Sequence, residues 1–274
     1  MKRTKVKSII AITLLLSLSI IMSFGVVGYA ESETRYADIH ASTYAAVNSS
    51  ETIYFTNREV SNVKLPNDVP RYNQLSALPN SCGPTAGAIV VGFYDKYFED
   101  LIPNYTAYVL TGTYKGNDHT YVPQLMQELY TLMRTNVDDV GVSETDCLNG
   151  LKAYVQNKGH NLSFTNVKGF NKVNSSSFTN AINNNNPVLL FCDKLDMYSI
   201  GMTEDHDVIA KTTIEGAHVA VGYGIRIVKY YNGNNLFRTD TYLHVATGLA
   251  LSSTCYLKLD ATDWCNAAYA VSIT

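Results

Sequence analysis

The sequence predicts an α+β fold with two lobes, because helical periodicity dominates its first part and strand-like patterns dominate its second. Apolar residues recur at helical spacing within residues 82–97, 122–134, 144–158 and 176–183. Segments rich in Val, Ile, Tyr and Leu follow at 187–192, 217–231, 239–246, 255–259 and 268–273. Helices that precede strands, instead of alternating with them, favour a helical lobe followed by an antiparallel β lobe.

The first helix is predicted to begin beside Cys82. Ser81 is a suitable N-cap, and Pro84 is tolerated in the first turn, where its missing N–H costs nothing. One face of this helix carries the apolar residues Ala86, Ile89, Val90, Phe93 and Tyr97.

Capping and turn residues set other boundaries. Ser143 is the predicted N-cap of the third helix, and Gly159 follows the end of that helix. The tripeptide Asn232-Gly233-Asn234 lies between two strand patterns and predicts a hairpin turn.

The N-terminal region reads as a secretory signal, residues 1–30. Basic residues precede an apolar run from Ile9 to Val27, and Gly28-Tyr29-Ala30 supplies small residues for cleavage. An uncleaved membrane anchor is the alternative, because the run is nearly long enough to span a bilayer. Residues 31–66 are polar and aperiodic, as in a linker or short leader arm, so the folded domain is expected at 67–274. The protein is therefore expected to be secreted or extracellular, with no membrane contact after signal cleavage.

The composition argues against some classes of function. The formal net charge of −3 offers no basic footprint for nucleic acid. The five cysteines leave at least one thiol unpaired and form no C-x-x-C metal motif, and their disulfide state stays open. Cys192 lies in an apolar strand pattern, where a buried, unreactive thiol is expected.

Cys82 is a candidate nucleophile. The thiolate is the reactive form of cysteine, and a helix N-terminus favours its negative charge. Gly83 is expected to leave room for a substrate, and the first-turn N–H of Cys82 can point at a developing oxyanion. Gln74, on the preceding loop, is a neutral amide suited to be the second oxyanion donor.

His218 is the candidate base. It opens the strand pattern G-A-H-V-A-V-G-Y-G, whose small residues permit close approach of another element. The other histidines lie in the arm, in polar loops or at a strand position that can face outward; they are His40, His119, His160, His206 and His244. A core histidine at 218 and a buried structural cysteine at 82 are the simpler alternatives.

The pattern Q-x(7)-C-G-P-T-A at a helix start, followed far downstream by G-A-H, resembles the papain-like cysteine peptidases. The closest subgroup is the bacteriocin-processing (double-glycine) peptidase-like domains, common as secreted proteins of Gram-positive bacteria, and the lead-in V-P-R-Y-N-Q is also similar to theirs. The resemblance implies a papain-like two-lobed fold, in which a helical lobe presents Cys82 and an antiparallel β lobe presents His218. It also implies that Gln74 serves the oxyanion.

The sequence departs from that family where an Asn or Asp should orient the histidine. Ala246 or Thr247 stands at the expected place. Thr247 can accept a hydrogen bond from the ring, and Asp260, Asp263 and Asn266 are later candidates. The identity of the orienting residue stays open.

These residues predict a thiol-dependent peptidase that hydrolyses a peptide or protein substrate through a Cys82–His218 pair and a thioester, with no cofactor. An amidase or acyltransferase acting on cell-wall peptides would use the same chemistry, and an inactive binding module is the third alternative. The acidic cluster from Glu204 to Asp207 is interpreted as a solvated loop, with Ca²⁺ binding as its alternative, and no metal site is predicted. The oligomeric state and the scissile bond are not predicted.

Overall fold

The computed structural model describes residues 35–36, 47–109, 111–137, 140–249, 254–261 and 264–274. All of them belong to the unit Thr34–Thr274. The predicted signal segment, 1–30, lies outside the described residues. In the described part of the chain, no helix combines the length and the apolar character that a membrane crossing requires.

The helices and strands occur in mixed order along the chain. They are β1 (Arg35–Tyr36), β2 (Val47–Tyr54), β3 (Asn57–Lys64), α2 (Cys82–Asp95), β4 (Tyr108–Val109), β5 (Thr113–Tyr114), α3 (Tyr121–Leu132), β6 (Val142–Ser143), α4 (Glu144–Asn157), β7 (Leu162–Asn166), α5 (Ser175–Asn183), β8 (Val188–Met202), β9 (His206–Asn232), β10 (Asn235–Ala246), β11 (Cys255–Lys258), the short 3₁₀ helix η3 (Leu259–Ala261) and β12 (Cys265–Ile273).

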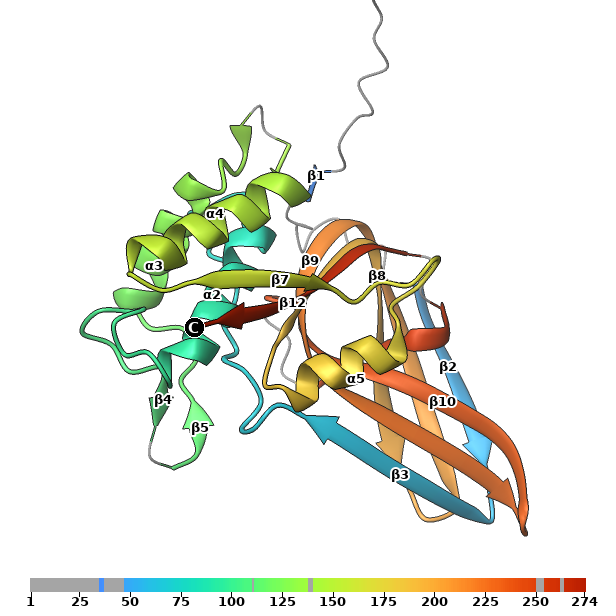
Figure 1. The fold of residues 1–274 in the computed structure, drawn as a ribbon. Helices are drawn as coiled ribbons and strands as arrows, with labels where there is room; N and C mark the ends of the chain where they lie inside the picture. The colour runs from blue at the N-terminus through green and yellow to red at the C-terminus, as the bar shows by residue number, and fades with distance from the viewer. Residues whose placement is uncertain (1–34, 37–46, 110, 138–139, 250–253, 262–263) are drawn as a thin grey trace, which may run out of the picture. The chain divides into compact units, whose positions relative to one another are not determined.

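Strand β9 organises the main sheet, which has eight antiparallel strands (Figure 1). Its N-terminal half pairs with β2 and β8, and its C-terminal half pairs with β3 and β10. The strand order is β2-β9-β10-β11-β8-β12-β7, and an additional β8–β9 pairing closes a ring of β8, β9, β10 and β11. The ringed strands and β2 carry a buried cluster of their own, formed by Ile53, Ile209, Val228, Tyr230, Tyr242 and Tyr256.

A β-bulge interrupts β9 immediately before His218. On β8, Cys192 pairs with His218 and Lys194 pairs with Glu215, so Gly216 and Ala217 together oppose a single residue. Gly216 has a φ of +111°, a backbone conformation that side chains other than glycine rarely adopt. Bulges bend a strand and redirect its next side chain, so the glycine sets the direction of His218.

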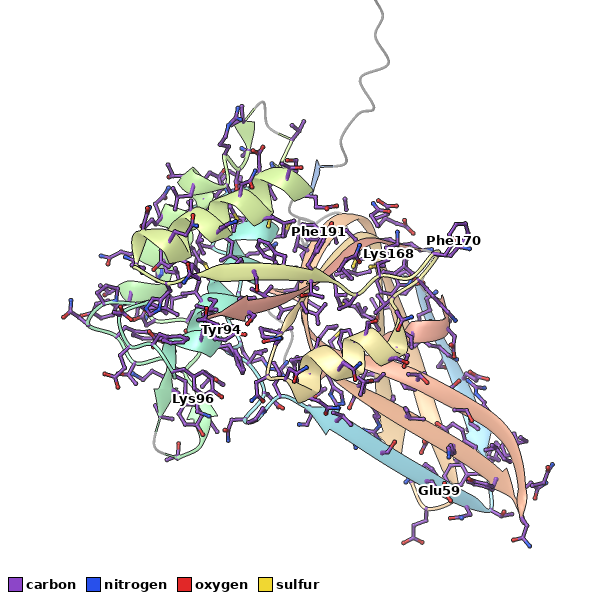
Figure 2. The ribbon with its side chains drawn as sticks, in the orientation of Figure 1. Glu59, Tyr94, Lys96, Lys168, Phe170 and Phe191 are labelled. Carbon is purple, nitrogen blue, oxygen red and sulfur yellow. The ribbon has the colours of Figure 1, made fainter. Side chains whose placement is uncertain are left out.

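Helix α2 is buried on every side. All its residues from Cys82 to Asp95 are buried, and it contacts α3, α4 and β9. The single apolar face predicted from the sequence is therefore too narrow a description, since a helix that is apolar all round belongs in a core. At its C-terminal end, the Tyr94 hydroxyl donates to the Val271 carbonyl of β12 at 2.8 Å, which ties the helix to the sheet (Figure 2).

The predicted layout of an N-terminal helical lobe followed by a C-terminal β lobe, as in papain, is wrong. The structure is mostly β and is built on one large antiparallel sheet. That sheet takes β2 and β3 from before the first helix and β7 from between two helices. The chain therefore does not place helices first and strands afterwards.

Two of the unpredicted strands, β2 and β3, lie within the segment expected to be a linker or leader arm. Each strand pairs only with β9, and its side chains are mostly exposed. Edge strands of this kind carry polar residues, which keep them from pairing with other chains. A polar edge strand gives no apolar alternation, so the sequence pattern did not reveal it.

The capping and turn residues predicted from the sequence around α4 and after β9 agree with the structure. The Ser143 hydroxyl accepts a hydrogen bond from the Asp146 N–H at the start of α4, and Gly159 beyond its end has a φ of +86°. The turn at Gly233, with a φ of +59°, joins β9 to β10 as predicted.

Candidate functional site

Cys82 is the first residue of α2. Ser81 occupies the N-cap position as predicted, but its hydroxyl makes no capping hydrogen bond; the Ser81 carbonyl accepts from the Thr85 N–H at 2.8 Å. The Cys82 side chain is only 1% exposed. The helix start is thus held inside the protein, with the cysteine at the positive end of the helix dipole.

His218 is anchored through one ring nitrogen. Its Nε2 lies 2.7 Å from the backbone carbonyl oxygen of Thr247. A carbonyl only accepts hydrogen bonds, so this contact fixes the tautomer with the proton on Nε2 and leaves Nδ1 as a proton acceptor. Within the described residues, Nδ1 is buried and has no hydrogen-bond partner.

Burial sets the charge state of the imidazole. His218 is 0% exposed. Burial lowers the pKa of His218 to about 4, and the Thr247 carbonyl offsets only part of that effect. The imidazole is therefore neutral at pH 7 while the site is closed.

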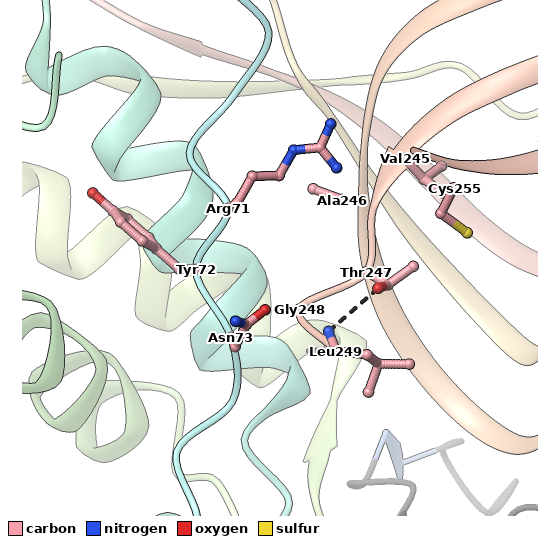
Figure 3. Close-up of a pocket in the computed structure, with 9 residues that line it drawn as sticks. All are labelled: Arg71, Tyr72, Asn73, Val245, Ala246, Thr247, Gly248, Leu249 and Cys255. Atoms are coloured by element: carbon pink, nitrogen blue, oxygen red, sulfur yellow. Dashed lines mark hydrogen bonds between the residues drawn. The ribbon is translucent and has the colours of Figure 1, made fainter. Parts of the chain in front are cut away.

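Gln74 joins the same region through the loop after β10. Its backbone N–H donates to the Gly248 carbonyl at 2.8 Å, next to the residue that anchors His218. Its side-chain Nε2 is buried and has no hydrogen-bond partner among the described residues. Figure 3 shows the segment Arg71–Asn73 running beside the Thr247–Leu249 loop, where a small pocket lies between them.

Contacts of α2 bring Cys82 to this region. A Cβ on Gly248 would lie 2.8 Å from Thr85 Cγ2, so the first turn of α2 packs against the loop that anchors His218. The first turn of α2, the Gln74 backbone and the His218 ring therefore each contact the Thr247–Gly248 segment. Cys192 is the direct cross-strand neighbour of His218.

Thr247 is the group that holds the histidine, but through its backbone. Its side-chain hydroxyl instead accepts a hydrogen bond from the Leu249 N–H, at 3.2 Å. Asp260 is exposed and pairs with Lys172, and the Asn266 amide donates to Asp193. Asp263 lies outside the described residues.

Gly83 has a different role from the one expected. A Cβ at this position would lie 2.6 Å from Val142 Cγ1 and 3.5 Å from Cys147 Sγ. The glycine therefore lets α2 approach the start of α4, and the expectation that it opens space for a substrate is wrong.

The acidic cluster is only partly solvated. Asp205 pairs with His206 on the surface, whereas Asp207 is fully buried, forms an ion pair with Arg58 and accepts a hydrogen bond from the Tyr230 hydroxyl. Among the described residues, no group of three or more His, Cys, Asp or Glu side chains is placed to bind a metal ion.

In a comparison with protein-family models, the chain matches the Peptidase_C39 like family over residues 66–250. This region includes the helix start, the bulged strand and the anchoring loop. The resemblance to bacteriocin-processing peptidases drawn from the sequence is confirmed at the level of family. Comparison with curated proteins gives no match, and comparison with solved structures gives none.

The anchoring loop predicts a stability difference between two glycine variants. Gly248 and Gly233 both have positive φ, +71° and +59°, but a Cβ at 233 meets nothing within 4 Å. Gly248→Ala should lower the free energy of unfolding by about 1–3 kcal/mol more than Gly233→Ala, because it also overlaps Thr85. Urea denaturation of the two variants measures this. Equal losses would show that the loop does not pack tightly on α2.

The buried neutral His218 predicts that the free energy of unfolding falls in acid. An unfolded histidine has a pKa near 6.5, so between pH 6.5 and about 4 the unfolded chain binds more protons than the folded one. Stability is therefore complete above pH 6.5 and is lost as the pH falls. From pH 7 to pH 5 the wild type should lose about 2 kcal/mol more than His218→Gln, whose amide can still donate to Thr247. Identical pH profiles in urea denaturation would contradict a buried neutral His218.

Proposed function

The chain belongs to the Peptidase_C39 like family, and on this basis we propose that it hydrolyses peptide bonds with Cys82 as nucleophile and His218 as base. The family supports a cysteine peptidase-like function in general terms. The assignment of roles to individual residues is our inference from the site.

The observation that carries this proposal is a pair of buried polar atoms of opposite kind. His218 Nδ1 is a hydrogen-bond acceptor and Gln74 Nε2 is a hydrogen-bond donor, and neither has a hydrogen-bond partner in the described part of the chain. Buried polar groups are rarely left unsatisfied, because desolvation without a hydrogen bond costs about 1–3 kcal/mol. An acyl-transfer site requires these two groups: an acceptor for the thiol proton and a donor for the oxyanion.

In the proposed reaction, the Cys82 thiol transfers its proton to His218 Nδ1 and the sulfur attacks the peptide carbonyl carbon. The Cys82 N–H and the Gln74 amide donate to the oxyanion that forms. When the tetrahedral intermediate collapses, the C–N bond breaks and His218 gives the proton to the leaving amine. His218 then removes a proton from water, which hydrolyses the thioester and releases Cys82.

In this scheme Thr247 orients the His218 ring and adds no formal charge to the site. Its carbonyl holds the ring through Nε2 and keeps Nδ1 available. A carboxylate in the same place would stabilise the imidazolium more strongly, because charged hydrogen bonds are roughly twice as strong as neutral ones. The proposed enzyme therefore forms its ion pair mainly when the substrate and the thiolate are present.

Both reacting side chains are shielded from solvent, so a substrate must displace part of the covering structure before it reaches the sulfur. The apolar N-terminal segment supports a secreted protein that meets peptides outside the cell. Peptides are the proposed substrates, and amide bonds of cell-wall peptides are the alternative that the assay must separate.

The test is hydrolysis of a fluorogenic peptide library, with casein and purified cell wall as parallel substrates. Cys82→Ala should abolish cleavage, and Gln74→Ala should lower kcat roughly 100- to 1,000-fold, the usual effect of removing one oxyanion donor. Gln124→Ala, an exposed glutamine of α3, is the matched control and should leave the rate unchanged.

Full activity in Cys82→Ala would exclude the proposed nucleophile. Cys82-dependent turnover of cell wall, without cleavage of the peptide library or casein, would instead favour the amidase. Selective loss of kcat in Gln74→Ala, with KM unchanged, is the signature expected of a group that binds the transition state.

A further inference from the structure

Two cysteines and the candidate base lie next to one another on three neighbouring strands of the sheet. Cys265 of β12 pairs with Cys192 of β8, and Cys192 pairs in turn with His218 of β9. Directly opposed residues of antiparallel strands share one face of the sheet, with Cβ atoms about 4.5–5.5 Å apart. The two thiols are therefore neighbours, and the second of them lies beside the candidate base.

The register places the two cysteines where cross-strand side chains come closest. The Asp193 N–H donates to the Trp264 carbonyl at 2.9 Å, which makes those residues the hydrogen-bonded pair next to Cys192 and Cys265. The cysteines are then a non-hydrogen-bonded pair, for which the Cα atoms lie about 4.5 Å apart. A disulfide requires Cα atoms about 4.4–6.8 Å apart, a range that includes this regular spacing, and the register of β12 shifts only after the cysteine, between Cys265 and Ala267.

No other cysteine is paired with a cysteine in the described strands. Cys255 of β11 lies opposite Val245, and Cys147 lies on helix α4. All five cysteines are thiols in this structure. At present the Cys192 thiol donates to the Leu190 carbonyl and the Cys265 thiol donates to the Ala267 carbonyl, so both side chains must rotate to meet.

We propose that Cys192 and Cys265 form a disulfide that links β8 to β12 when the chain folds in the presence of a small disulfide oxidant such as oxidised glutathione. One cysteine thiolate attacks the oxidant, its S–S bond breaks, and a mixed disulfide forms as one glutathione thiol leaves. The other cysteine then attacks the mixed disulfide and releases the second glutathione thiol. Two hydrogen atoms pass from the protein to the oxidant, and the balance needs no further reagent.

Burial determines when this exchange takes place. Both thiols are almost fully shielded, at 0% and 1% exposure, and burial raises the pKa of Cys265 to about 12. The thiolate is the attacking form, so exchange in the folded protein is slow. The bond forms during folding, and once formed it is protected by the same burial.

The disulfide would stabilise the strand that supports the site. It closes a long loop that contains all of β9, β10 and β11, and such cross-links restrict the unfolded chain. It also fixes β12 to the central strand β8, on which Phe191 precedes Cys192 (Figure 2). The disulfide also removes the Cys192 thiol beside His218, so that this thiol no longer competes with the Cys82 thiol for a hydrogen bond to His218.

The test is to refold the whole protein in a glutathione redox buffer, unfold it in denaturant with iodoacetamide to block the remaining thiols, and map the peptides by mass spectrometry without reduction. The expected result is a linked pair of peptides that contain Cys192 and Cys265, each unmodified by iodoacetamide, with Cys255 alkylated. The oxidised protein should also melt several degrees above the same protein kept in a reducing agent.

Matched variants separate this bond from other pairings. Cys265→Ser should remove the linked peptides and the dependence of the melting temperature on oxidant, whereas Cys255→Ser, another buried cysteine, should retain both. Alkylation of both Cys192 and Cys265 in the refolded wild type would overturn the proposal. So would a bond from Cys192 to Cys82 or to Cys147.

Discussion

The hydrogen bond from His218 Nε2 to the Thr247 carbonyl is the contact on which the site depends. It joins the bulged middle of β9 to the loop that follows β10. The same loop accepts the Gln74 N–H at Gly248, and the first turn of α2 packs against that glycine. One short loop therefore positions the candidate base, the candidate oxyanion donor and the helix start that carries Cys82.

Burial determines the protonation state of His218. A fully buried imidazole held by a neutral carbonyl stays uncharged, because desolvation outweighs the attraction of a dipole. At rest the imidazole is neutral, and among the described residues its Nδ1 acceptor and the Gln74 Nε2 donor have no hydrogen-bond partner. In the proposed reaction the Cys82 thiol donates to His218 Nδ1 and the oxyanion accepts from Gln74 Nε2, so both atoms gain partners as the transition state forms.

Residue types and local rules were enough to predict the start of α2 and the cap of α4. Cys82 at a helix start and the Ser143 cap followed from the sequence, because they depend on neighbours within a few positions. The role of Thr247 did not, since every residue has a backbone carbonyl and the choice among them is made by the fold. Thr247 was a candidate to hold the ring through its side chain, whereas its backbone carbonyl makes the contact.

The sequence did not predict the order of the strands in the sheet. The β lobe was expected to follow the helices, yet β2 and β3 come first in the chain and complete the sheet along β9. Their exposed side chains are polar, so no apolar alternation marked them. The length of β9 was also underestimated, because its N-terminal part has one short apolar run, Val208-Ile209-Ala210, among charged and polar residues and shows no regular apolar alternation.

The most direct test of this account is the tautomer of His218, observed by ¹⁵N NMR of histidine-labelled protein at pH 7. The six histidines can be distinguished by comparison with His218→Gln. The account predicts a neutral ring with a hydrogen-bonded proton on Nε2, an unprotonated Nδ1 and no titration above about pH 5. A proton on Nδ1, or a doubly protonated ring at pH 7, would contradict the anchoring by Thr247 and the assignment of Nδ1 as the base.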